Sequence, residues 1–160
     1  MRFLLSLVVL AALIYGGWPY YTYYRLDSAL AARDDREMGE LMDLESVRRN
    51  SEASAERRLQ RQLPGQDAVS AMVRDGARIV TRTAAQDVTV ESVRETLRGG
   101  PAKPDQPYPS LVGRTSFAFF ESPTQFVARV GDLGDATIAV RLDLQDWRWR
   151  VTGIYPCGGW

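Results

Sequence analysis

The feature that most constrains this chain is an uncharged segment at its amino end, which runs from position 3 to position 24 between Arg2 and Arg25. Its first part, from Phe3 to Ile14, contains one polar residue, Ser6. An apolar stretch of about 7–15 residues after a short basic start is typical of a secretory signal. A helix that spans a membrane needs about 20 mostly apolar residues. Both interpretations predict that the rest of the chain is exported.

The residues after the apolar run favour an anchor that is retained. Trp18 and the tyrosines at 20, 21, 23 and 24 form an aromatic group of the kind that prefers the level of the lipid headgroups. No small-residue cleavage site closes the run cleanly, and no nearby cysteine follows for a lipid. We expect a signal anchor at residues 1–19 that spans the membrane from about Phe3 to Trp18. The alternatives are cleavage with release of the rest of the chain and, less favoured, a buried core helix.

Charge sets the expected orientation of the anchor. Arg2 and the amino terminus are the positive charges nearest to the span, so the start should stay in the cytoplasm and the rest of the chain should lie outside. The whole chain has 20 Lys and Arg against 20 Asp and Glu. This balance gives no electrostatic reason to expect a nucleic-acid partner.

The inventory of reactive side chains is small. The chain has no histidine and one cysteine, Cys157, which excludes most zinc sites and the histidine-dependent nucleophilic mechanisms. We therefore expect no catalytic residues, no metal and no cofactor. Cys157 has two open interpretations, an intermolecular disulfide or an unreacted thiol.

Residues 20–100 have helical periodicity. Asp43 and Thr89 have the side chains that N-caps prefer, so they predict the starts of two of these helices. Pro64-Gly65 predicts the end of the helix that Asp43 starts. We expect helices at 22–32, 37–42, 44–63, 66–82 and 90–98.

The arginines of the helix at 44–63 have two interpretations. A run of basic residues can dock an acidic partner or lipid. Glutamates are interleaved with them, which favours a solvated face with exposed ion pairs.

The chain changes character after residue 100. Residues 101–113 are rich in proline and glycine and predict a linker. Residues 114–156 then alternate with a period of two, most clearly from Ile138 to Leu144. Four strands joined by short turns predict an antiparallel meander, with the helices packed on its apolar face. Residues 20–156 should therefore form one α+β domain.

Three segments carry a resemblance to a known family. They are the aromatic segment WPYYTYYRLDSALAARD, the helix start MDLESVRRN and the tail that ends in DWRWRVTGIYP. Together they resemble the bacterial family called domain of unknown function 2939. Its box of aspartate, apolar residue, branched residue and arginine is similar to Asp43, Leu44, Val47 and Arg48. Its S-P-x-x-F turn is similar to Ser122, Pro123 and Phe126.

The resemblance implies an envelope location and no known activity. The anchor would then lie in the bacterial inner membrane with the domain in the periplasm, or the chain would be secreted to the periplasm after cleavage. The order of helices followed by a sheet also looks like the nuclear transport factor 2-like or cystatin-like fold, in which helices wall a concave pocket. We expect a domain that binds a small apolar ligand or an envelope protein. An isomerase or hydrolase with a pocket carboxylate and a purely structural interaction protein are the alternatives.

The last hairpin supplies the candidate contact residues. Trp147 and Trp149 alternate with Arg148 and Arg150, so the two pairs should point to opposite faces of the sheet. The tryptophans are expected to pack in the core with Ile138, Val140, Leu142 and Leu144. All four residues of the hairpin are also candidates for contact with a ligand or partner.

Overall fold

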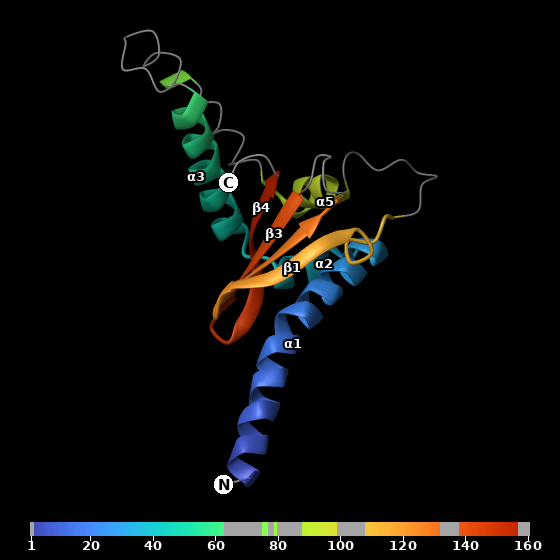
Figure 1. The fold of residues 1–160 in the computed structure, drawn as a ribbon. Helices are drawn as coiled ribbons and strands as arrows, with labels where there is room; N and C mark the ends of the chain where they lie inside the picture. The colour runs from blue at the N-terminus through green and yellow to red at the C-terminus, as the bar shows by residue number, and fades with distance from the viewer. Residues whose placement is uncertain are drawn as a thin grey trace.

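The computed structural model describes residues 2–62, 75–76, 79, 88–98, 108–131 and 138–156. Its elements, drawn in Figure 1, are α1 (Arg2–Ala32), α2 (Asp35–Leu41), α3 (Leu44–Gln62), α5 (Val90–Arg98), β1 (Thr115–Ser122), β2 (Gln125–Val130), β3 (Ile138–Gln145) and β4 (Arg148–Pro156). Most of the helix expected at 66–82, positions 101–107 of the linker, and Cys157 lie outside the described residues.

Helix α1 continues through the position where the sequence analysis expects the anchor to end. The helix expected to begin at Thr22 is the second half of α1 and not a separate element, with Pro19 in the helix interior. Proline lacks an amide hydrogen and removes one intrahelical hydrogen bond. Pro19 is buried, and residues of α1 on both sides of it pack on the sheet. This packing holds the helical path across the missing bond.

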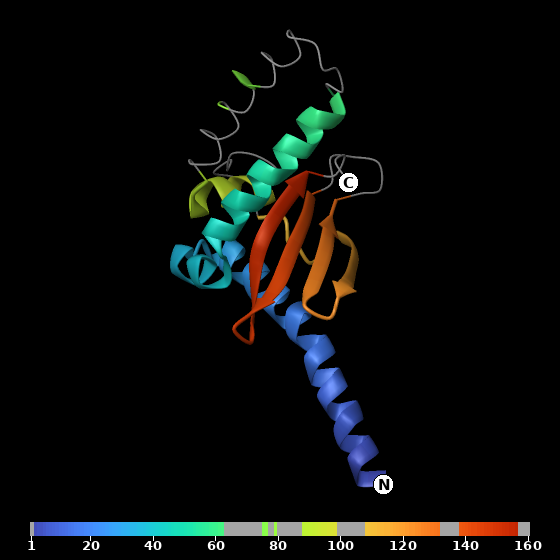
Figure 2. The same cartoon turned by 90° about the vertical axis from the view of Figure 1, so that its left-hand side faces the viewer.

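The two halves of α1 have different surroundings. Apolar side chains of the first half are exposed, for example 94% at Phe3, 52% at Val9 and 57% at Leu10. In the second half, Tyr23, Leu26 and Leu30 belong to the hydrophobic core. Figures 1 and 2 show the first half projecting away from the rest of the molecule. One helix therefore supplies both an apolar rod and a wall of the core.

The sheet is the expected antiparallel meander. Its strand order is β1-β2-β3-β4. One face carries Phe126, Val140 and Trp149 into the core, where they meet residues of α1, α2, α3 and α5. The predicted α+β architecture with an N-terminal apolar helix and four antiparallel strands is confirmed.

The free edge of β4 is covered by the segment between α2 and α3. Met42 forms an isolated parallel bridge with Val151, and the Asp43 amide donates to the Val151 carbonyl at 2.9 Å. The amide group of Asn50 on α3 donates to the next edge carbonyl, that of Thr152, at 2.7 Å. These contacts satisfy edge groups that would otherwise be open to pairing with another chain.

The turn between β3 and β4 corrects the expected place of Trp147. Gln145 pairs with Arg148, so Asp146 and Trp147 form a two-residue turn in which both have positive φ, 47° and 59°. Turns of this kind match the twist of a hairpin. The Trp147 side chain is 79% exposed, while that of Trp149 is 3% exposed. Trp149 is in the core as expected, and Trp147 is not.

Candidate functional site

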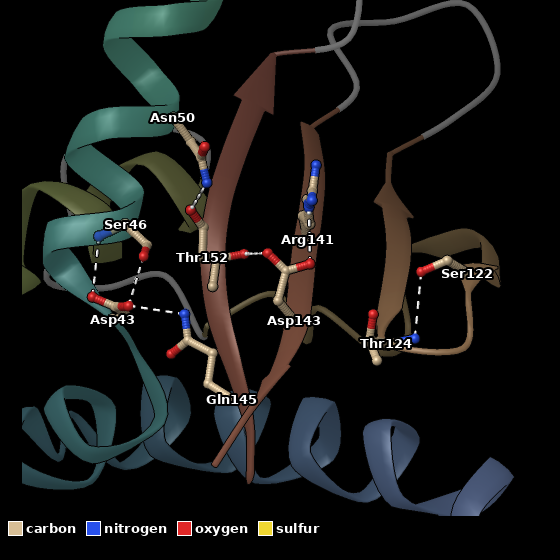
Figure 3. Close-up of polar contacts among 9 residues, drawn as sticks. All are labelled: Asp43, Ser46, Asn50, Ser122, Thr124, Arg141, Asp143, Gln145 and Thr152. Atoms are coloured by element: carbon tan, nitrogen blue, oxygen red, sulfur yellow. Dashed lines mark hydrogen bonds and ion pairs between the residues drawn. The ribbon is translucent and has the colours of Figure 1, made fainter. Parts of the chain in front are cut away.

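The aspartate of the Asp43–Leu44–Val47–Arg48 box caps α3. Its Oδ1 accepts from the Ser46 amide at 3.0 Å, and its Oδ2 accepts from the Ser46 hydroxyl at 2.6 Å. Figure 3 shows the Gln145 amide reaching the same Oδ2 from the end of β3, at 3.0 Å. The predicted N-cap is confirmed, and it also joins the start of α3 to the β3–β4 hairpin.

These bonds set the ionisation of the cap. Partial burial raises the pKa of the Asp43 carboxyl, but the hydrogen bonds from Ser46 and Gln145 outweigh it, so the pKa lies below its ordinary value. The carboxylate is therefore the form that holds the cap. Its stabilising contribution is complete above the ordinary aspartate pKa of about 3.9 and is lost as the pH falls through the folded-state pKa.

Replacing Asp43 with alanine should lower the free energy of unfolding by about 1 kcal/mol, within a range of about 0.5–2 kcal/mol for caps. Asp43→Asn keeps one acceptor and should lose less. Urea unfolding of the full chain in detergent at neutral and acid pH measures both variants. The alanine variant should approach the wild type in acid, and a deficit that did not change with pH would contradict the role of the carboxylate.

The next two box residues connect α3 to α5. Val47 is 4% exposed in the core. Arg48 donates to the Val88 carbonyl from Nε at 3.2 Å and from Nη2 at 2.9 Å, just before α5 begins. Arg48 thus links α3 to the residue before the cap of α5. This corrects the prediction that it lies on a solvated face with the other arginines of α3. The Thr89 hydroxyl accepts from the Ser92 amide at 3.2 Å, as the predicted cap of α5.

A pocket of about 160 Å³, half-open to the surface and called the cavity below, lies beside these contacts. Its described lining comes from α3, from α5 with the residue before its cap, and from β4: Val47, Ser51, Val88, Ser92, Val93, Thr96 and Ile154. Small-molecule sites are usually about 300–1,000 Å³. The cavity therefore has the volume for one ring or one short branched chain rather than for a whole ligand of that size.

The hydroxyl groups that line the cavity already donate hydrogen bonds to backbone carbonyls. Ser51 donates to the Arg48 carbonyl at 2.7 Å, and Ser92 donates to the Thr89 carbonyl at 3.0 Å. Thr96 donates to the Ser92 carbonyl at 2.8 Å. Each hydroxyl has one proton, so none remains for a guest. The described lining includes no carboxylate, phenol or cationic side chain. The cavity is thus chemically suited to an apolar group.

A second polar cluster ties the two last strands together. The Asp143 carboxylate accepts from Arg141 at 3.1 Å and from the Thr152 hydroxyl at 2.6 Å, as Figure 3 shows. Thr152 is 1% exposed. Each carboxylate oxygen accepts one hydrogen bond, one from Arg141 on the same strand, β3, and one from Thr152 on β4. We interpret this cluster as structural.

The four hairpin candidates do not share one surface. Trp149 lies in the core, with its ring 6.3 Å from that of Tyr15 between centroids. Trp147 and Arg148 are exposed at the turn, and Arg150 is half-buried. None of them lines the cavity. The sequence contained a signal for two sides of the cavity, the box with Val47 and the family tail DWRWRVTGIYP with Ile154, but none for Val88.

Two further findings concern the described part of the chain. One helix there, Phe3–Ala32, is long and apolar enough to cross a membrane by length and composition. A signal sequence would pass the same test. No group of three or more histidine, cysteine, aspartate or glutamate side chains among the described residues is placed to hold a metal ion.

Comparison with known proteins gives one match. No curated protein and no solved structure matches the chain. The model of the family described as "Protein of unknown function (DUF2939)" matches residues 8–97, more than half of the chain. The match includes α2, α3, the box and α5, and so covers most of the described cavity lining. The chain belongs to the DUF2939 family.

Proposed function

We propose that the protein is a membrane-anchored binding domain of the bacterial cell envelope and that its cavity receives a small apolar group. The first half of α1 is the anchor, with the amino terminus in the cytoplasm and the domain in the periplasm. The observation that carries the proposal is the cavity at the family box, which is apolar and has no free proton donor among its described residues. The arrangement of helices against one face of a curved meander supports a cystatin-like likeness.

The size of the cavity sets the class of guest. An enclosed cavity of about 150 Å³ in a protein core can hold benzene, and the cavity of this protein has a similar volume but is half-open to the surface. The guest we propose is accordingly a single apolar side chain of an envelope protein or the end of a small apolar ligand. The membrane contributes by concentrating such groups near the domain.

Benzene is the probe that tests the cavity. The full chain in lipid nanodiscs is titrated with benzene while the methyl resonances of Val47, Val93 and Ile154 are followed. We expect shifts at these methyl groups, since they line the cavity. Thr96→Phe should abolish the shifts because its ring would occupy the cavity.

Glu95→Phe is the matched control for this titration. Glu95 is an exposed neighbour on the same helix that does not line the cavity, so the variant should keep the wild-type response. Methyl shifts that are absent in the wild type, or that survive in Thr96→Phe, would contradict binding at this cavity.

A further inference from the structure

We propose that the β3–β4 turn rests in the headgroup layer of the same bilayer that α1 crosses, with Trp147 as its membrane-contacting side chain. This inference depends on the anchor proposed above. Its partner is a lipid surface, and the residues that carry it are Tyr15, Pro123, Trp147 and Trp149.

The length of the free part of α1 gives the first argument. Tyr15 is the first residue of α1 described as packed against the core, and its hydroxyl donates to the Pro123 carbonyl in the β1–β2 turn. From Phe3 to Tyr15 an α-helix rises about 18 Å. The hydrocarbon core of a bilayer is about 30 Å thick. The free part of the helix is therefore about 12 Å shorter than the hydrocarbon core, and since a bilayer thins locally to match a short span, the turns of the sheet are drawn against the headgroup layer.

The direction of the hairpin gives the second argument. Trp149 lies beside Tyr15, and Trp147 comes two residues nearer to the tip. Two residues of strand extend at most about 7 Å. In both Figure 1 and Figure 2 the β3–β4 turn is drawn on the side of the sheet toward the amino end of α1. Trp147 thus reaches at least as deep as the first contact between helix and domain.

The side chain and its backbone give the third argument. Trp147 is 79% exposed, although its ring is among the largest apolar groups of the chain. Its φ of 59° is a conformation that bulky residues rarely adopt. On α1, Trp18, Tyr20 and Tyr21 are 44%, 46% and 61% exposed at the same end of the domain. Tryptophan and tyrosine are enriched where membrane and water meet.

Together these features place exposed aromatic rings on two elements, α1 and the β3–β4 turn. The rings of α1 follow the apolar rod, and Trp147 adds a second point of contact from the sheet. Two points of contact fix the tilt of the domain on the membrane, whereas a helix alone leaves the domain free to rotate about the helix axis. The role of the turn is therefore to orient the cavity relative to the lipid surface.

Quenching by labelled lipid tests the depth of the turn. In full-length Cys157→Ser, which lacks the single native cysteine, either Trp147→Cys or Val112→Cys is labelled with an environment-sensitive fluorophore. Val112 is the control because it is apolar and 42% exposed, in the segment before β1. Both proteins are placed in phosphatidylcholine vesicles with and without a spin label on the headgroup. Position 147 should be quenched about threefold more than position 112, as expected for a group at the interface.

Flotation of the same vesicles after a carbonate wash separates this inference from the proposed anchor. If the chain floats and position 147 is quenched no more than position 112, the turn does not touch the membrane and the inference is wrong, while the anchor stands. If the chain does not float with the vesicles, the anchor fails and the inference fails with it. Flotation together with selective quenching at position 147 supports both.

Discussion

Replacing Trp149 with alanine is expected to lower the free energy of unfolding by about 3–5 kcal/mol, the range for a buried large aromatic residue. The indole is 3% exposed and makes edge contacts with Tyr15 and Phe120, at centroid distances of 6.3 Å and 5.9 Å. It therefore joins α1, β1 and β4. Domains of this size usually have a total stability of about 5–15 kcal/mol, so the loss would be a large share.

Trp147→Ala is the matched control, since the same side chain is removed two residues away. Its side chain is exposed, and its loss in detergent should stay within about 0.5 kcal/mol. Trp149→Phe should lose less than the alanine variant, because the buried indole N–H has no partner among the described residues. Denaturant unfolding of the full chain measures all three. Equal midpoints for the two alanine variants would contradict the core assignment.

Placing aspartate at two positions of α1 should have opposite consequences. Leu26 is 0% exposed. Leu26→Asp puts a carboxyl group into the apolar core and should destabilise the domain by more than about 4 kcal/mol. Leu10 is 57% exposed on the projecting half of the helix. Leu10→Asp should leave the fold intact but weaken insertion by about 2.5–3.5 kcal/mol.

Two measurements on each variant separate these effects. Near-ultraviolet circular dichroism reports the packing of the aromatic core, and membrane flotation reports insertion. Leu26→Asp should lose the dichroism signal, and Leu10→Asp should keep the signal and float less. Loss of packing in Leu10→Asp would mean that the first half of α1 belongs to the core.

The elements that could be predicted from the sequence are those with local signals. The alternation from Ile138 to Leu144 predicted a strand, and Asp43 and Thr89 predicted the starts of α3 and α5. Each depends on side chains within a few residues of one another, where periodicity and capping act. The family box marks residues that hold α3 against the start of α5, although the sequence analysis assigned no binding site to them.

The features that could not be predicted depend on distant contacts. Proline normally interrupts a helix. At Pro19 the packing of α1 on the sheet keeps the helix continuous. The bridge from Met42 to Val151 joins segments more than one hundred positions apart, and no local pattern marks it. The cavity was missed for the same reason, because its wall combines Val47, Val88 and Ile154 from separate parts of the chain.

Trp147 shows how a correct period can lead to a wrong position. Its spacing from Trp149 fits a strand, which predicts that the connection after β3 ends at Asp146. Pairing of Gln145 with Arg148 moves the turn by one residue, to Asp146 and Trp147. Aspartate is common at the first position of such turns, but tryptophan carries no turn signal. A shift of one residue was enough to move a large ring from the core to the surface.

The central claim is that one helix lies in the membrane at its first half and in the domain at its second. Single cysteines at Leu10 and Ser28, both exposed on α1, are introduced into full-length Cys157→Ser in sealed vesicles and treated with a membrane-impermeant maleimide. We expect Ser28→Cys to react and Leu10→Cys to stay unlabelled until the vesicles are dissolved in denaturing detergent. Equal labelling of the two positions in intact vesicles would contradict the claim.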